Sequence, residues 1–217
     1  MRKEERDRLE VNRKVIEAVV NFVNYDFKKS TLAEALNIAA LLDEALSSAH
    51  RSFFLVRDYF YQYALKNISS KEFRDKASSV QKEWRGVVDF ILEHADRPMV
   101  LRYAGPEQFF FYGEGTRFSL QVGQMPWLAI PIKELEVSTG IIDDLGKYVE
   151  KGKQIFPYGA DVFFEALSGF PVSVIKGCPA CGKIFTHFSK REKEYCSVRC
   201  QHNTAELKGY HRRKGQK

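Results

Sequence analysis

The sequence predicts an α+β fold, with a mainly helical first half, a small antiparallel sheet after it and a compact cysteine-rich module at the C-terminal end. Apolar residues recur every three to four positions in the first half, as they do on the buried face of a helix. Short aromatic and β-branched runs, separated by Gly and Pro, follow from about residue 99. The four cysteines all lie between Cys178 and Cys200. A chain of 217 residues is long enough for one large domain and one small module.

Helices are expected first. Their apolar stripes cover residues 9–23, residues 36–46 and about residues 71–93. The second helix begins with a Ser/Thr-x-x-Glu capping box formed by Thr31 and Glu34, and its period extends into the aromatic run of residues 52–61. Ser69 or Ser70 would cap the third helix.

Strands are expected next, because the pattern changes to short runs with turn residues between them. They cover residues 99–103, residues 108–112 and residues 117–122. Residues 127–137 would add an edge strand, since Pro131 lacks the N–H of a central strand. A helical pattern returns at about residues 141–150, where the Asp143-Asp144 pair favours a first turn, and again at about residues 159–167. Helices followed by strands without regular alternation indicate an α+β domain.

Charge divides the chain in the same place as the cysteines. The net charge is +6, but residues 176–217 hold 11 of the 34 Lys and Arg and only 3 of the 28 Asp and Glu. This end therefore carries +8, while residues 1–175 carry −2. We place a boundary between a body of residues 1–172 and a basic module of residues 173–217, and we expect the module to meet a polyanion.

The sequence argues against a membrane or secreted protein. No apolar run reaches the roughly 18–20 residues of a membrane helix, and the charged start MRKEERDRLE lacks the apolar core of a secretory signal. We therefore expect a cytoplasmic protein without membrane association. The body contains no Gly-rich phosphate loop, no nucleophile elbow and no His-Glu-x-x-His motif, so no catalytic residue is assigned.

The C-terminal module carries the clearest chemical pattern. Cys178 and Cys181 are separated by two residues, and Cys196 and Cys200 follow after fourteen more. Thiolates four positions apart lie on one side of a helical turn, so we expect the second pair to open a helix. The residues 183–195 between the pairs are enough for a hairpin. Four thiolates suit tetrahedral Zn²⁺ at about 2.3 Å, and the order of knuckle, hairpin and helix predicts a treble-clef-like zinc finger.

Other uses of these cysteines are open. Disulfides require an oxidising compartment, which no feature of the sequence supports. A redox pair would use Cys178 and Cys181 and leave the other two cysteines without a role. An iron–sulfur cluster takes the same ligands, and spacing alone does not distinguish it from zinc. Zinc is the cofactor that we expect, because a module this small needs a metal to fold.

The expected helix would also present a basic surface. At about 100° per residue, Cys200 and Thr204 share the face toward the metal, and Arg199 and His202 lie on another face. Arg, His and Asn side chains donate hydrogen bonds to bases and phosphates. The residues expected to contact nucleic acid are Arg199, His202, Asn203, Arg212, Arg213 and Lys214.

The module resembles the CGNR-type zinc finger, which follows an ABATE domain in bacterial transcription regulators. The likeness is carried by Phe185 and Ser189, four and eight residues after Cys181, and by the run Tyr195-Cys196-Ser197. Gln201-His202-Asn203 stands where that family has Gly-Asn-Arg, so the motif is divergent. The resemblance implies DNA binding by the finger, with an ABATE-like body that serves as a sensor or as an oligomerisation domain of a homo-oligomer.

A zinc-finger protein that binds nucleic acid is therefore predicted, with a DNA-binding transcription regulator as the leading hypothesis. The alternative is a non-enzymatic module for RNA or another protein, because treble clefs serve all these partners. A treble-clef metal-dependent nuclease is a third hypothesis, suggested by His187, His202, Asn203 and His211. Four cysteine ligands leave the metal no open position for catalysis, so an enzyme is not expected.

Overall fold

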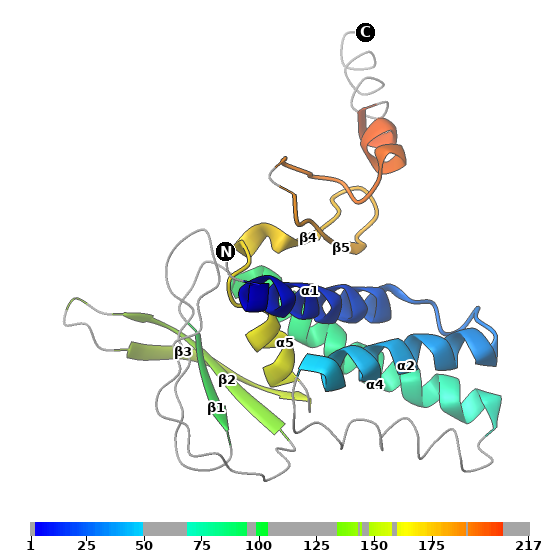
Figure 1. Ribbon diagram of the computed structural model, residues 1–217, viewed down its shortest axis with the longest axis horizontal. Helices are drawn as coiled ribbons and strands as arrows, with labels where there is room; N and C mark the ends of the chain where they lie inside the picture. The colour runs from blue at the N-terminus through cyan, green and yellow to red at the C-terminus, as the bar shows by residue number, and fades with distance from the viewer. Residues whose placement is uncertain are drawn as a thin grey trace, which may run out of the picture. The chain divides into compact units, whose positions relative to one another are not determined.

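The chain divides into two compact units, Met1–Val172 and Ser173–Lys217 (Figure 1). The computed structural model describes residues 3–49, 69–94, 99–103, 134–142, 144, 148–157, 160–189 and 191–205. The first unit contains helices and a three-stranded sheet, and the second contains a two-stranded sheet and the four cysteines. The protein therefore has an α+β fold, as the sequence predicts.

Four helices build the first unit in the described part of the chain. They are α1 (Lys3–Asn24), α2 (Leu32–Ala49), α4 (Ser70–His94) and α5 (Ala160–Leu167). Helix α1 packs against α2, α4 and α5, and α4 also contacts the sheet (Figure 1). The helices expected from apolar spacing over the first 93 residues are confirmed, and so is the one expected near residues 159–167. The extension through residues 52–61 lies outside the described residues.

Two capping boxes fix where α2 and α4 begin. The Glu34 carboxylate accepts from the backbone N–H of Thr31 at 2.8 Å, and the Thr31 hydroxyl accepts from the N–H of Glu34 at 3.3 Å. The same exchange joins Ser69 and Glu72, at 3.0 and 3.2 Å. Each box satisfies backbone donors that a helix start leaves without partners, so these boundaries follow from local sequence.

The described sheet of the first unit has three antiparallel strands in the order β1–β2–β3. Its strands are β1 (Met99–Tyr103), β2 (Glu134–Ile142) and β3 (Tyr148–Pro157). Strand β1 confirms the first expected strand, while those expected at residues 108–112 and 117–122, and most of the one at residues 127–137, lie outside the described residues. Residues 134–137 belong to β2, which pairs with a strand on each side, so the edge position expected for this part is wrong.

The helix expected at residues 141–150 is wrong, because residues 141–142 end β2 and residues 148–150 begin β3. Ile141 pairs with Val149, and Ile142 pairs with Tyr148. Residues of these β-branched and aromatic types favour strands, and the strand pairing outweighs the weak helical spacing of the same stretch. Asp144 consequently lies in the turn between the strands and not in a helix.

Aromatic side chains join the sheet to the helices. The ring of Phe156 on β3 lies 5.0 Å from that of Phe90 on α4 and 6.0 Å from that of Phe164 on α5, measured between centroids. Trp84 and Phe163 make a further edge contact at 6.0 Å. Phe156, Phe163 and Phe164 are each at most 2% exposed, so this cluster is the centre of the core.

The connection between α1 and α2 is held against α4. The Gln81 amide donates to the carbonyl oxygens of Phe22 and Tyr25 at 2.7 and 2.6 Å, and Arg74 donates to the Ser30 carbonyl at 3.3 Å. Phe27 is buried beneath the connection, with its ring 5.4 Å from that of Phe22. Backbone and side chain thus fix this short segment at both ends.

One carboxyl group lies on the buried face of a helix in the core of the first unit. Asp43 is on the buried face of α2 at 6% exposure, and its Oδ1 has no hydrogen-bond partner in the described structure. Burial raises the pKa of Asp43 to about 8, because the apolar surroundings disfavour the charged form. The side chain is therefore largely protonated at neutral pH.

The second unit begins with the short η1 (Val172–Val174) at its boundary, followed by β4 (Ile175–Gly177) and β5 (Ile184–Thr186). The two strands pair in antiparallel fashion, with Lys176 opposite Phe185. A helix follows over residues 198–205 of the described chain. None of the described helices is both long and apolar enough to cross a membrane.

Candidate metal centre

The first cysteine pair lies in the turn between β4 and β5. The backbone N–H of Cys178 donates to the Lys183 carbonyl at 2.8 Å, and the N–H of Gly182 donates to the Cys178 carbonyl at 2.9 Å. Gly182 adopts a φ of 69°, in the left-handed region that favours glycine. The turn therefore closes tightly behind Cys181 and directs both thiols to one side of the hairpin end.

The expected position of the hairpin needs correction. The cysteine spacing predicts a hairpin after the first pair, in residues 183–195, whereas the observed hairpin straddles that pair. In residues 187–189 and 191–197 the described chain forms no strand. The reason lies in composition: this stretch is charged and polar, whereas Ile175 and Ile184 supply the β-branched residues that pair.

Side-chain contacts order the segment between the two cysteine pairs. His187 donates its backbone N–H to the Val174 carbonyl at 2.8 Å, and its ring Nε2 contacts the Arg191 carbonyl. The Arg191 N–H donates to the Ser189 hydroxyl at 3.2 Å. The Lys193 ammonium lies 5.5 Å from the centroid of the buried Phe185 ring. These contacts return the chain to the hairpin before Cys196.

The second pair is positioned by a helix start. The Ser197 hydroxyl accepts from the N–H of Cys200 at 3.2 Å, and the Ser197 carbonyl accepts from the N–H of Gln201. Ser197 is therefore the N-cap, and the helix begins one residue later. Cys200 lies in the first turn as expected, but Cys196 precedes the helix. Sequence reasoning missed this cap, although a Ser three residues before Cys200 is a recognisable signal.

The four sulfur atoms meet at one point. Their Sγ atoms all lie within 4.8 Å of one another. Cys196 Sγ is 3.5 Å from Cys181 Sγ and 3.6 Å from Cys200 Sγ. A tetrahedral ion with metal–sulfur bonds of about 2.3 Å would place its ligands about 3.8 Å apart, so the observed spacing fits one such ion. The four cysteines are free thiols, and together they can hold a metal ion.

The electrostatics of the cluster also fit a cation. Burial disfavours the Cys178 thiolate, but backbone N–H groups of Cys196, Ala180 and Cys181 donate to the sulfur and lower the pKa of Cys178 to about 6. Burial and the neighbouring thiols raise the pKa of Cys196 to about 12. Sulfurs this close cannot all ionise on their own, and a divalent ion among them would remove that restriction.

The residues predicted to contact nucleic acid divide into two groups. Arg199, His202 and Asn203 lie exposed on the helix of residues 198–205, whereas Cys200 and Thr204 are half-buried. This difference agrees with the two helix faces expected from the sequence. The remaining predicted residues, Arg212, Arg213 and Lys214, lie outside the described residues.

Comparison with known proteins gives no relative for this chain. No family model matches the sequence, no curated protein matches it, and no solved structure matches the fold.

Proposed function

We propose that Cys178, Cys181, Cys196 and Cys200 hold a structural Zn²⁺ ion and that the second unit is a treble-clef-like zinc finger. The convergence of four thiol sulfurs within 4.8 Å carries this proposal. A hairpin turn supplies one pair of ligands and a helix start supplies the other, and zinc prefers such a closed set of four thiolates. In its described part the small unit contains few buried apolar residues, so metal binding would supply much of its folding free energy.

The zinc finger serves, in this proposal, to bind DNA as part of a transcription regulator. Arg199, His202 and Asn203 are exposed hydrogen-bond donors that lie on a different face of the helix from Cys200. Arg and Asn donate to base edges, and Arg and His donate to phosphates. The segment that follows is rich in Lys and Arg and would add phosphate contacts. The resemblance to the CGNR-type finger points to the same function.

The test is fluorescence anisotropy of the full chain with mixed-sequence duplex DNA, titrated at several salt concentrations. Arg199→Gln is expected to weaken binding and to lower the slope of log affinity against log salt by about one. Arg191→Gln removes the same charge from the same unit but lies off the helix, so it is the matched control. Equal effects of the two substitutions, or no duplex binding by metal-loaded protein, would refute the proposed surface.

Parallel titrations with structured RNA and heparin separate DNA binding from the alternative function. Preference for the duplex supports a DNA-binding role. A preference for structured RNA, or binding to heparin as strong as to DNA, would instead favour a non-enzymatic interaction module. Metal content is measured on the same samples, so that failure of the metal site is distinguished from failure of DNA recognition.

A further inference from the structure

The four cysteines of the metal centre differ in their exposure to solvent. Cys181 is exposed, Cys196 and Cys200 are half-buried, and Cys178 is buried at 3% exposure. Cys178 directly follows β4 and donates its backbone N–H to the Lys183 carbonyl, whereas Cys181 lies in the turn itself. A reagent in solution therefore reaches the sulfur of Cys181 before it reaches the other three.

A second sulfur lies directly beside the exposed one. Cys196 Sγ is 3.5 Å from Cys181 Sγ and 3.6 Å from Cys200 Sγ. A disulfide bond is about 2.05 Å long, so a movement of about 1.5 Å would join Cys181 to Cys196. Cys196 precedes the helix of residues 198–205 and can adjust its backbone, whereas Cys200 is held in the first helical turn. The geometry therefore favours a disulfide between Cys181 and Cys196.

Coordination to a metal would make these sulfurs nucleophilic at neutral pH. A metal keeps its cysteine ligands deprotonated, and the thiolate is the form that attacks an electrophile. Reactive thiolates occur in exposed, positively charged surroundings, and the exposed Lys183 follows Cys181 by two residues. An exposed thiolate with a second cysteine beside it is the arrangement of an oxidation-sensitive cysteine and its resolving cysteine.

We propose that hydrogen peroxide modifies this protein at Cys181 and that Cys196 converts the product to a disulfide. The Cys181 sulfur attacks one peroxide oxygen, the O–O bond breaks, and the departing hydroxide takes up a proton to become water. Cys181 then carries a sulfenic acid. The Cys196 thiolate attacks the Cys181 sulfur, the S–S bond forms, the S–O bond breaks, and a second hydroxide is protonated to water. The two thiolates together lose the two electrons that the peroxide gains.

This inference rests on the proposed metal site and adds a means of regulation to it. The disulfide removes two of the four ligands and leaves Cys178 and Cys200, which are too few for a closed site. The second unit would lose its metal and the order that depends on it, whereas the first unit contains no cysteine and would stay unchanged. A small-molecule thiol would reduce the disulfide and make the change reversible.

The experiment treats the zinc-loaded full chain with hydrogen peroxide at neutral pH. Released zinc is measured with a chromogenic chelator, and disulfides are mapped by mass spectrometry after alkylation and trypsin digestion. Trypsin places the first cysteine pair in residues 177–183, the third cysteine in residues 194–199 and the fourth in residues 200–208. The expected product joins residues 177–183 to residues 194–199, with fragmentation locating the bond at Cys181, and one zinc ion is released per disulfide.

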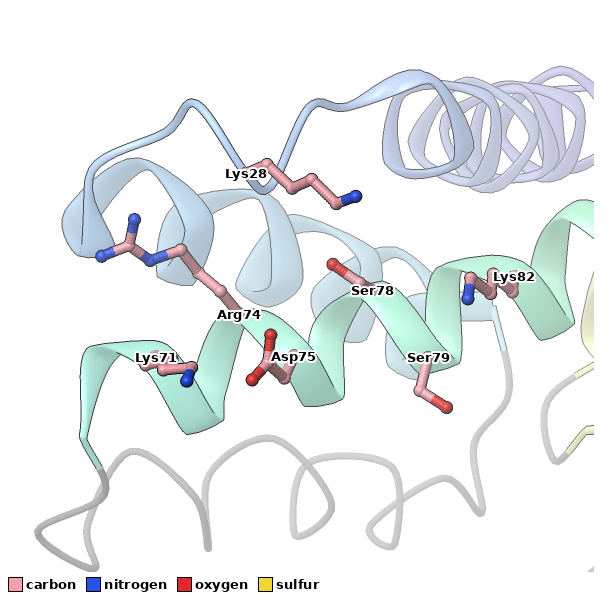
Figure 2. A pocket seen from close by; sticks show the side chains of 7 residues that line it. All are labelled: Lys28, Lys71, Arg74, Asp75, Ser78, Ser79 and Lys82. Atoms are coloured by element: carbon pink, nitrogen blue, oxygen red, sulfur yellow. The ribbon is translucent and has the colours of Figure 1, made fainter.

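Substitutions test the role of the exposed sulfur. Histidine can replace cysteine as a zinc ligand and offers no thiol to peroxide. Cys181→His is expected to slow zinc release at least about tenfold, whereas the matched control Cys200→His keeps the reacting pair and should release zinc at nearly the wild-type rate. Ser79→Cys places an ordinary exposed thiol on α4 (Figure 2). That thiol should react at least about tenfold more slowly than Cys181, because only a few per cent of a free thiol is ionised at pH 7.

The outcomes decide the proposal. A disulfide between other cysteines, zinc release without a disulfide, or equal protection by the two histidine substitutions would overturn it. Equally fast oxidation at position 79 and at Cys181 would also overturn it, since exposure alone would then explain the reaction. Elemental analysis before peroxide is added separates these results from failure of the metal centre, in which the chain contains no zinc at the start. If the histidine variants do not retain zinc, the disulfide map of the wild type decides alone.

Discussion

The buried carboxyl of Asp43 gives the sharpest prediction about stability. In the folded state burial raises the pKa of Asp43 to about 8, from an ordinary value of 3.8. A group whose pKa is raised by folding makes its full contribution to the stability of the folded state at pH values below its pKa in the unfolded state. That stability is then lost as the pH rises through the folded pKa. Asp43→Asn removes the titration and keeps nearly the same side-chain volume in the helical core.

The size of the effect follows from the shift. Each pH unit between the two pKa values changes the free energy of unfolding by about 1.4 kcal/mol. Between about pH 5 and about pH 8 the wild type is therefore expected to lose roughly 3–4 kcal/mol relative to Asp43→Asn. Little further change is expected above about pH 9, because Asp43 is then ionised in both states.

The assay is urea unfolding followed by far-ultraviolet circular dichroism at a series of pH values. Subtracting the wild-type free energy from that of the variant cancels the titration of every other group. Glu44→Gln is the control, because Glu44 is exposed on the same helix next to Asp43. Parallel pH profiles for the wild type and Asp43→Asn would refute the argument that Asp43 is protonated by burial.

Three further substitutions test the core, a helix cap and the metal centre. Phe163→Ala removes a fully buried ring that contacts Trp84, so a loss of about 3–5 kcal/mol is expected in urea unfolding; a loss below about 1 kcal/mol would contradict the packing. Ser69→Ala removes the cap of α4 and should cost about 1 kcal/mol, whereas Ser79→Ala, an exposed change within the same helix, should not destabilise. Cys200→Ser should lower the metal content well below one ion per chain by elemental analysis, and unchanged content would exclude Cys200 as a ligand.

Features set by neighbouring residues could be predicted from the sequence. The capping boxes at Thr31 and Ser69 give helix starts to within a residue, because donor and acceptor are only three positions apart. The four metal ligands could also be predicted from the sequence, since a turn positions one cysteine pair and a helix start positions the other. Strand β1 could also be predicted from the sequence, because it is a short run of strand-forming residues with a turn signal after it.

Features that depend on distant pairing could not be predicted in the same way. At Ile141 and Val149 the helical and strand patterns coincide, and only the register with the opposite strand decides between them. The hairpin around Cys178 was missed for a related reason, because Ile175 precedes the cysteine motif and its partner Thr186 follows it. Asp43 gave one usable signal, a charged residue inside the apolar stripe of its helix.

The way in which Gln81 holds the connection after α1 has a consequence for sequence divergence. Its amide binds main-chain oxygens of Phe22 and Tyr25, and every amino acid provides such an oxygen. Exposed side chains along this connection can therefore change between homologues while the backbone keeps its path, whereas the buried Phe27 cannot. Position 28 is one that natural variation or a designer could use to alter the charge of the neighbouring surface without refolding the protein.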